Sequence, residues 1–343
     1  MTERGKVRIA VDAMGGDHAP SEIIKGALKA AEQGNVDIFL VGDQDILAQE
    51  LGTIDLSKLP LQIVPSQGVI EEGEAPNVAL RQKPQASVMI ASQLVKMGKA
   101  DAFVSMGSTG AIMACAYFML GLLEGIERPT LGGPFLGLAP KTVFIDLGTN
   151  VDSRPIQLLG FGILGAVLAT TLVGIEKPRV ALLSVGSEEG KGNRQVKEAY
   201  PLFQTSDLNF VGNIEGDALL TDKADVIICD GFVGNILMKF SEGLGQSISY
   251  YLLDQLTGQL EKQKAEELTS ELYRLTHLVE HMGGGPILGV NGVAIVGHGR
   301  SRASSVNSAI DMARVLVEGG FVHNMQERLN QMNANISSDQ EQL

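Results

Sequence analysis

Nine apolar segments alternate along the chain with longer segments of helical character. Most are apolar without interruption, which is typical of strands buried on both faces of a parallel sheet. The segments span residues 7–12, 37–42, 61–66, 101–106, 142–148, 179–185, 208–213, 225–230 and 291–297. This alternation predicts an α/β fold, a three-layer α/β/α sandwich around a mainly parallel sheet. We expect a single domain over residues 1–332 and a disordered polar tail over 333–343.

Residues 236–282 interrupt the alternation with helical sequence that contains no strand-like segment. Gly258 is expected to divide this stretch into a protruding helical hairpin. Its second half carries an apolar stripe at alternating spacings of four and three residues, formed by Leu268, Leu272, Leu275, Val279 and Met282. Such a stripe packs either on its own domain or on the same hairpin of a second chain. We favour the second arrangement, a four-helix dimer interface.

Residues 156–175 contain no charged side chain over a length that could cross a bilayer. The preceding residues Asp152, Ser153 and Pro155 are typical of a helix start in a soluble protein, with a cap and then a proline in the first turn. A strand-like segment follows at once. We therefore expect a buried central helix rather than a membrane span.

The composition excludes some classes of protein. The net charge of −13, from 27 basic and 40 acidic residues, argues against non-specific nucleic-acid binding. The two cysteines, Cys115 and Cys229, lie in apolar surroundings and form no Cys-x-x-Cys pair, so we expect buried, inert thiols in a reducing cytosol. The first sixteen residues show no signal-peptide pattern, which favours a cytoplasmic protein.

Glycine-rich turns follow several of the predicted strands. They span residues 11–20, 105–113, 184–193, 229–235 and 296–305. In an open parallel sheet the carboxyl ends of the strands meet at one edge, where ligands bind. Helix N-termini offer unpaired N–H groups there, and glycine lets an anion approach the backbone. Five such turns predict an anion-binding cleft.

The turn "GSEEGKGN" (186–193) resembles a nucleotide phosphate loop but departs from it in two ways. Three residues instead of four separate its first two glycines, and Gly192 occupies the place of the Ser or Thr that would hold Mg²⁺. Nucleotide hydrolysis therefore loses support. From spacing alone, Lys191 is equally compatible with neutralising a phosphate and with an ordinary solvated loop lysine.

Two other motifs point to structure rather than chemistry. "GFGILG" (160–165) matches the dinucleotide pattern Gly-x-Gly-x-x-Gly but lies inside a predicted helix, so its glycines are interpreted as close-packing positions. "HLVEH" (277–281) matches an inverted zinc-protease pattern, yet both histidines are expected to face solvent, and no third ligand is evident. His18 and His298, each within two residues after a glycine at a strand end, are open to backbone hydrogen bonding or to proton transfer and phosphate binding.

The glycine-rich segments together resemble one family. "VRIAVDAMGGDHAP", "SMGSTGAIM", "DLGTNVDSRP", "SVGSEEGKGN", "FVGNIEGDALL", "DGFVGN" and "VGHGRS" are similar, in this order, to segments of the bacterial phosphate acyltransferases, the acyl-acyl-carrier-protein:phosphate transacylases. The resemblance runs from about residue 7 to 330. Thr149 stands where alanine is usual, and the region from Thr130 to Phe144 diverges.

The resemblance implies a fold similar to that of isocitrate and isopropylmalate dehydrogenases and of phosphotransacetylases. It implies a homodimer that associates peripherally with the inner face of the membrane. The reaction would transfer a fatty acyl group reversibly from acyl carrier protein to inorganic phosphate, within one catalytic domain. The acyl phosphate would pass to a membrane glycerol-3-phosphate acyltransferase for phospholipid synthesis. No metal, redox cofactor or ATP is implied.

Site residues carried over from the matching motifs fit this reaction. Phosphate is itself the nucleophile, so positioning and preorganised donors can supply most of the catalysis. Lys191 is expected to neutralise and orient phosphate, and Asn235 to donate to the oxyanion or to phosphate. The expected substrate-binding residues are Gly15, Gly16, Asp17, His18, Ser108, Thr109, Gly110, Gly234 and His298.

Acyl carrier protein is acidic, so a chain of net charge −13 needs a local basic surface to bind it. The expected docking residues are Arg179, Arg194, Lys197, Arg300 and Arg302, the first three in a cationic run with Lys177 and Lys191. For the membrane, the hairpin carries mixed charge and lacks a basic face. Insertion would rest on Leu252, Leu253 and Leu256 at its tip, as the resemblance suggests.

Two rival functions remain open from the sequence. A decarboxylating NAD(P)-dependent dehydrogenase shares the fold class, but it needs Mg²⁺ carboxylates and a dinucleotide turn, and neither is convincing here. A non-enzymatic scaffold would bind carrier protein or lipid without releasing the carrier thiol. Acyl carrier thioester supplied with and without phosphate separates all three functions.

Overall fold

The computed structural model describes residues 5–52 and 54–340 of the chain. It forms two compact units. Unit 1 comprises Met1–Glu124 and Met282–Gln326, and unit 2 comprises Gly125–His281 and Glu327–Leu343. Each unit carries its own strands and helices, and the single domain predicted over residues 1–332 stays a prediction.

The strands of unit 1 follow the order β3-β2-β1-β4-β11-β10. They are β1 (Val7–Asp12), β2 (Val36–Gly42), β3 (Leu61–Pro65), β4 (Ala102–Ser105), β10 (Gly285–Leu288) and β11 (Val293–Val296). All neighbouring pairs are parallel except β10 and β11. Because β1, β4 and β11 are adjacent and parallel, the loops that follow them leave from the same edge of the sheet.

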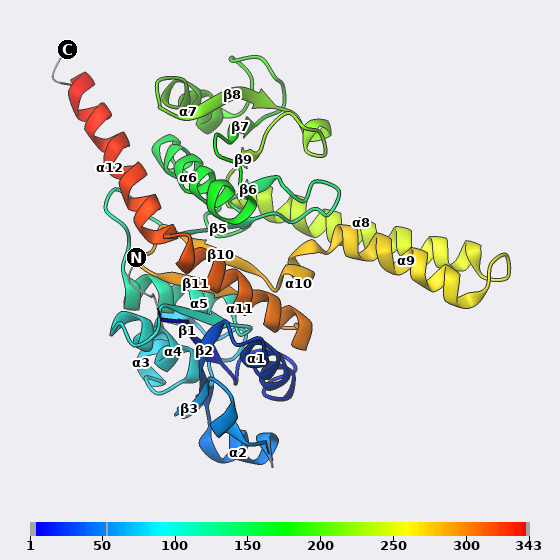
Figure 1. The fold of residues 1–343 in the computed structure, drawn as a ribbon. Coiled ribbons are helices and arrows are strands. Elements are labelled where there is room, and N and C mark those ends of the chain that lie inside the picture. The colour runs from blue at the N-terminus through cyan, green and yellow to red at the C-terminus, as the bar shows by residue number, and fades with distance from the viewer. Residues whose placement is uncertain (1–4, 53, 341–343) are drawn as a thin grey trace. The chain divides into compact units, whose positions relative to one another are not determined.

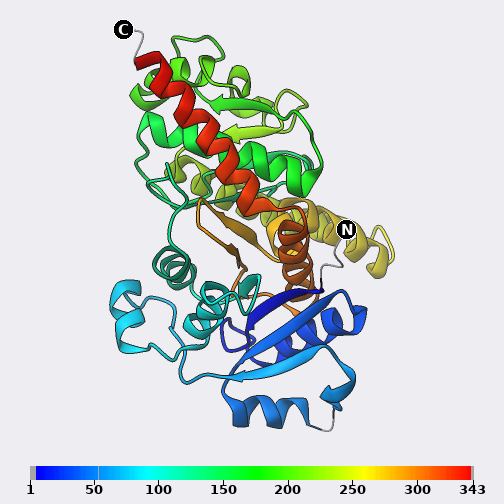
Figure 2. The ribbon, with the colours of Figure 1, turned by 60° about the vertical axis from the view of Figure 1, so that its left-hand side comes forward.

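Helices cover both faces of the unit 1 strands. Figure 1 shows β1 and β2 between α4 and α1, and Figure 2 shows this unit from another side. The helices are α1 (Ser21–Gln33), α2 (Gln44–Leu51), α3 (Pro76–Gln82), α4 (Ser87–Lys96), α5 (Thr109–Cys115) and α11 (Ala303–Glu318), with short turns η1 (Leu56–Lys58) and η2 (Ala116–Leu120). The layers are therefore helix, sheet and helix, as the alternation predicts.

The strands of unit 2 follow the order β5-β6-β9-β7-β8. They are β5 (Thr130–Gly133), β6 (Val143–Ile145), β7 (Arg179–Leu183), β8 (Asn209–Ile214) and β9 (Val226–Ile228). The pairs β6–β9, β9–β7 and β7–β8 are parallel, and β5 is antiparallel to β6. The carboxyl ends of β6, β9 and β7 are thus neighbours. The segments that follow them contain predicted site residues or residues that hold those segments in place.

The helices of unit 2 include the charge-free segment of the sequence. They are α6 (Pro155–Leu168), continued by η3 (Ala169–Val173), then α7 (Arg194–Gln204), η4 (Gly216–Ala218), α8 (Gly231–Leu256), α9 (Lys262–Thr276) and α10 (Leu278–Met282). The last helix, α12 (Phe321–Gln340), begins in unit 1 and ends in unit 2. Its backbone is helical over 333–340, where the sequence predicts a disordered tail, and residues 341–343 lie outside the described residues.

Helix α6 is the buried central helix that the sequence predicts. Pro155–Val173 is long and apolar enough to cross a membrane, but every residue from Gln157 to Leu168 is buried within the protein. A side chain at Gly162 would place its Cβ 2.6 Å from Phe203 Cε1, and one at Gly165 would place it 2.7 Å from Val226 Cγ1. These glycines therefore allow close packing, as interpreted. The helix start differs from the prediction, because Arg154 is the N-cap residue and its backbone N–H donates to Gln157 Oε1 at 2.8 Å.

Residues 231–282 form the predicted hairpin, which is divided near Gly258. Figure 1 shows α8 and α9 side by side, extending away from the strands of their unit. The two helices pack closely, since a Cβ at Gly245 would lie 2.0 Å from Thr276 Oγ1. The heptad stripe predicted from Leu268 to Met282 does not run along one helix. Helix α9 ends at Thr276, and His277 adopts non-helical angles before α10 begins.

The predicted fold class, mixed α/β with mainly parallel strands, is confirmed. Each of the nine predicted strands corresponds to an observed strand within a few residues. The sequence analysis missed β5 and β10, which are the antiparallel strands. Both are four residues long, and both contain glycine, so neither produces an uninterrupted apolar segment.

Candidate active site

The glycine-rich loop after β7 carries Lys191 in unit 2. Lys191 lies two residues before Asn193, the N-cap residue of α7, whose side-chain oxygen accepts from Val196 N at 3.0 Å. The backbone N–H of Lys191 donates to Glu188 O at 3.0 Å. Its aliphatic stem packs beside Gly186, where an added Cβ would lie 2.8 Å from Lys191 Cγ. The loop is therefore held by its own hydrogen bonds, and the Lys191 side chain is exposed.

Lys191, unlike Arg194 and Arg154, has no fixed carboxylate partner among the residues that the structure describes. Arg194 Nε lies 3.0 Å from Glu198 Oε1, and Arg154 forms an ion pair with Glu127. An exposed ammonium group at the mouth of a helix N-terminus can attract and hold an anion. The structure thus presents Lys191 as an available cation at the end of a buried strand.

The turn after β6 is organised by Asp146. This residue is fully buried, and its Oδ1 accepts from Gly148 N at 2.9 Å and Thr149 N at 2.8 Å. Its Oδ2 accepts from Asn150 N at 2.8 Å and Asn150 Nδ2 at 2.7 Å. Both oxygens of the buried carboxyl group are therefore hydrogen-bonded within its own turn.

Asn235 lies directly over this turn. A Cβ at Gly148, whose φ is +127°, would lie 3.2 Å from both Cβ and Oδ1 of Asn235. Asn235 is the fifth residue of α8, so it lies beyond the first turn in which the sequence analysis expected it. Its side chain is exposed and not buried in the helix contact. The side-chain amide is the group of this residue that can reach a ligand.

Gly234, expected to bind substrate, faces the protein instead. A Cβ on Gly234 would lie 1.8 Å from Asp146 O and 3.2 Å from Cys229 Sγ. The residue is buried between the start of α8 and the turn after β6. Its contacts indicate that glycine is needed here so that the helix can approach the turn closely.

Two hydrogen-bonded contacts join these loops of unit 2. The backbone N–H of Gly231, at the start of α8, donates to Asn150 O at 2.7 Å. The side chain of Gln195, in the first turn of α7, donates through Nε2 to Asp230 Oδ2. The loop that bears Lys191 and the helix that bears Asn235 are thus connected through side chains.

The buried thiols behave as the sequence predicts. Burial raises the pKa of Cys229, and the carboxylates of Asp230 and Asp146 raise it further. Burial likewise raises the pKa of Cys115 to about 12. Both cysteines are free and buried, so neither supplies a thiolate nucleophile near neutral pH.

Unit 1 brings together the loops after β1, β4 and β11. The backbone N–H of Asp17 donates to Gly299 O at 2.8 Å, and a Cβ at Gly16 would lie 3.2 Å from that oxygen. A Cβ at Gly15 would lie 2.9 Å from Gly107 N. The two glycines therefore allow three loops to meet with little space between them, and Asp17 is exposed at this junction.

A buried hydrogen-bonded pair lies beneath these loops. Ser105 Oγ donates to Asp12 Oδ2 at 2.6 Å, and Ser105 Oγ accepts from Gly107 N at 3.2 Å. Met14 N donates to Asp12 Oδ1 at 3.1 Å. Burial raises the pKa of the Asp12 carboxyl group, although the hydrogen bond from Ser105 acts in the opposite direction. The pair links the ends of β1 and β4.

The remaining predicted residues of unit 1 lie around the same three loops. Ser108 is buried at the N-cap of α5, whereas Thr109 and Gly110 are exposed. His18 and His298 are half-buried, and their backbone carbonyls accept from Glu22 N at 3.1 Å and Ser301 N at 2.9 Å. These bonds involve only the main chain, so the roles predicted for the two imidazole rings, hydrogen bonding to backbone, proton transfer or phosphate binding, stay predictions.

The predicted docking residues do not form one continuous run. Arg179 begins β7, at the opposite end of the strand from the loop that carries Lys191. Its guanidinium group is bound to Asp225 and Asp222, and these hydrogen bonds raise its pKa. By contrast, Arg194 and Lys197 are exposed on α7. In unit 1, Arg300 and Arg302 are exposed on either side of the buried Ser301.

The two histidines of the zinc-protease pattern lie in different surroundings in the structure. His277 is buried and stacks on Tyr273 with ring centroids 3.7 Å apart, while His281 is exposed on α10. The prediction that both histidines face solvent is therefore wrong for His277, because the helix ends before it. Among the described residues, no group of three or more His, Cys, Asp or Glu side chains could hold a metal ion.

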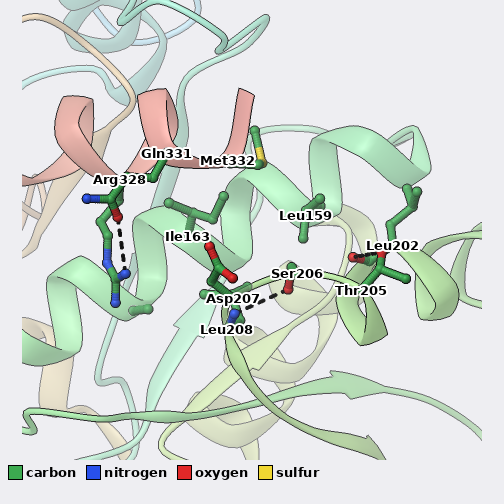
Figure 3. Close-up of a pocket in the computed structure, with 11 residues that line it drawn as sticks. Leu159, Ile163, Leu202, Thr205, Ser206, Asp207, Leu208, Arg328, Gln331 and Met332 are labelled. Atoms are coloured by element: carbon green, nitrogen blue, oxygen red, sulfur yellow. Dashed lines mark hydrogen bonds between the residues drawn. The ribbon is translucent and has the colours of Figure 1, made fainter. Parts of the chain in front are cut away.

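A crevice elsewhere in unit 2 contains none of the predicted site residues. Its volume is about 80 Å³, and it is lined by α6, residues 202–208 and the part of α12 that includes Arg328. Figure 3 shows Arg328 hydrogen-bonded to Gln331 beside apolar side chains of α6. The Thr205 and Ser206 hydroxyl groups already donate to backbone carbonyls. The predicted site residues thus lie in the loops at the strand ends and not in this crevice.

Sequence reasoning missed three acidic residues that organise the loops with predicted site residues: Asp12 in unit 1, and Asp146 and Asp230 in unit 2. Each stands at the end of a buried strand or within two residues of it, and each is itself buried. An aspartate between an apolar strand and a glycine-rich turn was the available signal, because such a carboxylate can accept hydrogen bonds from the turn.

Comparison with known proteins identifies the family. The model of a family described as "Fatty acid synthesis protein" matches residues 7–324. The phosphate acyltransferase of Pelotomaculum thermopropionicum is 44% identical over 327 residues, which are 94% of this chain and 95% of that protein. The phosphate acyltransferase of Desulfitobacterium hafniense is 39% identical over 332 residues, 96% of this chain and 99% of that protein.

Solved structures support the fold. A phosphotransacetylase from Streptococcus pyogenes superposes with a TM-score of 0.63 at 17% identity, over 91% of this chain and 94% of that chain. The EutD phosphotransacetylase from Staphylococcus aureus gives 0.57 at 16% identity, with the same coverage. The resemblance drawn from the glycine-rich segments is confirmed: the chain belongs to the fatty acid synthesis protein family, and within it to the enzymes named phosphate acyltransferases.

Proposed function

We propose that this enzyme transfers a fatty acyl group reversibly from acyl carrier protein to inorganic phosphate, giving acyl phosphate for phospholipid synthesis. The observation that carries the proposal is the exposed Lys191 ammonium group beside the N-terminus of α7, in a chain of the phosphate acyltransferase family. A cation at this place suits a small anionic nucleophile.

In the proposed reaction, a phosphate oxygen attacks the thioester carbonyl carbon. The C–O bond forms, the C–S bond breaks, and the electron pair leaves with sulfur, which takes a proton to become the free carrier thiol. Lys191 would hold and orient the phosphate, and the Asn235 amide would donate to phosphate or to the developing oxyanion. No side-chain nucleophile is needed, which agrees with the raised pKa values of both cysteines.

The loops of unit 1 are proposed to bind substrate as well. Their exposed groups include Asp17, Thr109 and Gly110, and the half-buried His18 and His298 lie on neighbouring loops. The support is the close approach of the loops after β1, β4 and β11, which gathers backbone donors at one sheet edge.

The experiment that tests the proposal supplies acyl carrier thioester with and without inorganic phosphate. We expect free carrier thiol and acyl phosphate to form in equal amounts, and only when phosphate is present. Binding without thiol release would instead support a scaffold. Product formation that requires NAD(P) would support a dehydrogenase.

Arg194 offers a test of carrier docking. Its side chain is 89% exposed at the start of α7, so it can contact an acidic partner. Arg194→Glu is expected to raise KM for acyl carrier protein about threefold to tenfold at low salt, and less at high salt, because ions screen exposed charges. Lys141→Glu makes the same charge change before β6 and should have little effect. An equal effect at both salt concentrations would contradict docking at Arg194.

A homodimer is proposed through the hairpin, and the best support is an exposed apolar row on α8. The row consists of Phe232, Ile236, Phe240, Leu244 and Ile248, all exposed at intervals of four residues. Gly245, which packs against α9, lies on a different face of the helix from Phe240 and Leu244 in the middle of the row. A contiguous exposed apolar row favours an interface, and a second copy of the hairpin would bury it symmetrically.

Phe240 is the residue that tests the dimer, since its side chain is 64% exposed near the middle of the row. Phe240→Glu is expected to convert the dimer into a monomer, measured as solution mass by light scattering, because a carboxylate would be buried without a partner. Gln246→Glu adds the same charge outside the row and should leave the mass unchanged. A wild-type protein that is strictly monomeric would contradict the proposal.

Peripheral contact with the inner face of the membrane is proposed at the hairpin tip. Tyr250, Tyr251 and Leu252 are exposed there, whereas Leu253 and Leu256 are half-buried. Aromatic and aliphatic side chains of this kind partition into the headgroup region. Flotation with vesicles checks the contact, and it should weaken when Leu252 is replaced with aspartate. Such a location would allow acyl phosphate to reach a membrane glycerol-3-phosphate acyltransferase.

A further inference from the structure

Gln195 joins two elements that carry the residues proposed for catalysis. It is half-buried in the first turn of α7, four residues after Lys191. Its Nε2 donates to Asp230 Oδ2. Asp230 is 7% exposed and forms the N-cap of α8, five residues before Asn235. The contact is therefore a direct link between the two helix N-termini.

The two carboxylate oxygens of Asp230 have separate partners. Oδ1 accepts from Val233 N at 2.8 Å, which satisfies a donor of the first turn of α8. Oδ2 accepts from Gln195. Oδ1 alone caps α8, so capping does not need the hydrogen bond from Gln195 to Oδ2. That bond instead fixes α7 relative to α8.

The segment between Gln195 and Lys191 transmits this constraint. Gly192 has a φ of +107°, and a Cβ there would lie 2.7 Å from Val196 Cγ1 and 3.0 Å from Ser184 Oγ. Asn193 caps α7, and Asn213 Nδ2 holds the far side of the loop by donating to Glu188 O at 3.0 Å. These contacts couple the position of Lys191 to that of α7.

We propose that Gln195 is a positioning residue, whose hydrogen bond to Asp230 places the Lys191 loop at the correct distance and angle from Asn235. The inference rests on the proposed function for the roles of Lys191 and Asn235. It concerns the side-chain link itself, which touches neither substrate. Loss of the link lets the loop move, so phosphate is held less well and reacts more slowly.

Single substitutions remove the link in two ways. Gln195→Leu deletes the donor and leaves Asp230 Oδ2 without a partner. Gln195→Glu places a second carboxylate against a buried one, which repels it. Each variant is expected to raise KM for phosphate and lower kcat, with kcat/KM for phosphate falling about tenfold or more. Asp230→Asn should be mild, because its Oδ1 still caps α8 and the amide of Gln195 can rotate to accept.

The decisive variant is the reciprocal pair Gln195→Glu with Asp230→Asn. The Asn amide would donate to the Glu carboxylate, so the hydrogen bond reforms with donor and acceptor exchanged. We expect the pair to recover most of the kcat/KM for phosphate that Gln195→Glu loses. Thermal unfolding identifies any variant that fails to fold, and in that event the mild Asp230→Asn and the reciprocal pair carry the comparison.

Amide hydrogen exchange over residues 186–196 provides a readout that does not depend on turnover. Exchange should quicken in Gln195→Leu and Gln195→Glu and return toward the wild-type rate in the reciprocal pair. Folded Gln195 variants with wild-type kinetics and exchange would overturn the inference, as would a reciprocal pair no better than Gln195→Glu. A wild-type enzyme that makes no acyl phosphate would refute the proposed function instead, and the exchange data would still decide whether Gln195 positions the loop.

Discussion

Replacing Lys191 with alanine is expected to lower kcat/KM for phosphate about 10²–10³-fold while leaving thermal unfolding nearly unchanged. The side chain is exposed and has no carboxylate partner among the described residues, so its removal costs little stability. In the proposed reaction it is the cation that neutralises the phosphate nucleophile. Steady-state kinetics at varied phosphate measure the change, and we expect both KM and kcat to respond.

A matched control separates this role from a general loss of positive charge. Lys141 is exposed just before β6, at the opposite end of the unit 2 strands from the glycine-rich loops. Lys141→Ala removes the same charge from the same unit and should retain wild-type kinetics. A folded Lys191→Ala enzyme with full turnover would show that the assignment of Lys191 is wrong.

The second large effect is expected for Gly234→Ala, through packing rather than chemistry. The new Cβ would lie 1.8 Å from Asp146 O, and a backbone carbonyl cannot rotate away as a side chain can. The start of α8 must therefore shift from the turn after β6, carrying Asn235 with it. The free energy of unfolding should fall by about 2–4 kcal/mol, measured by denaturant titration, and activity should fall with it.

Gly243 is the control on the same helix. An added Cβ meets no atom within 4 Å, so Gly243→Ala introduces no contact. Because alanine favours helix more than glycine by about 1 kcal/mol, this variant should be as stable as the wild type or more so. Similar destabilisation by both substitutions would mean that the contact with Asp146 is not the cause of the loss.

The strand positions were predictable because burial on both faces leaves a direct mark on the sequence. Segments such as Val7–Asp12 and Arg179–Leu183 are apolar except for Arg8 and the charged residues at their ends, and glycine-rich turns follow them. Strand β5, with the sequence TLGG, has no such mark. Strand β5 is defined by its pairing with β6, and local sequence preference does not reveal such a pairing.

The hairpin shows the limit of periodicity. Gly258 correctly indicated where the helices separate, but the stripe of leucines did not indicate which surface is exposed. Helix α9 ends within the stripe, and His277, the residue after its end, stacks on Tyr273. The heptad spacing of the leucines does not reveal this helix end. The exposed apolar row lies on α8 instead, at a spacing of four residues that the sequence analysis did not consider.

The candidate site was predictable as a set of loops, but not as a set of contacts. Glycine-rich turns after strands identified Lys191 and the start of α8. Asp146 holds its own turn through local hydrogen bonds, whereas Gln195 and Asp230 join two segments that are distant in the sequence. Arg179 illustrates the opposite error. The sequence analysis assigned Arg179 to a basic docking surface, yet Asp225 and Asp222 already neutralise its positive charge.

The turn after β6 also explains where this sequence is free to vary. Asp146 is bound by the backbone N–H of Thr149 at 2.8 Å, and a backbone donor is present whatever side chain the residue carries. Threonine or another residue at position 149 therefore leaves the turn intact. By the same reasoning, we expect substitution of Asn150 to disrupt the turn, because its side-chain amide donates to both Asp146 and Pro129. Related chains should accordingly exchange residues readily at position 149 and rarely at position 150.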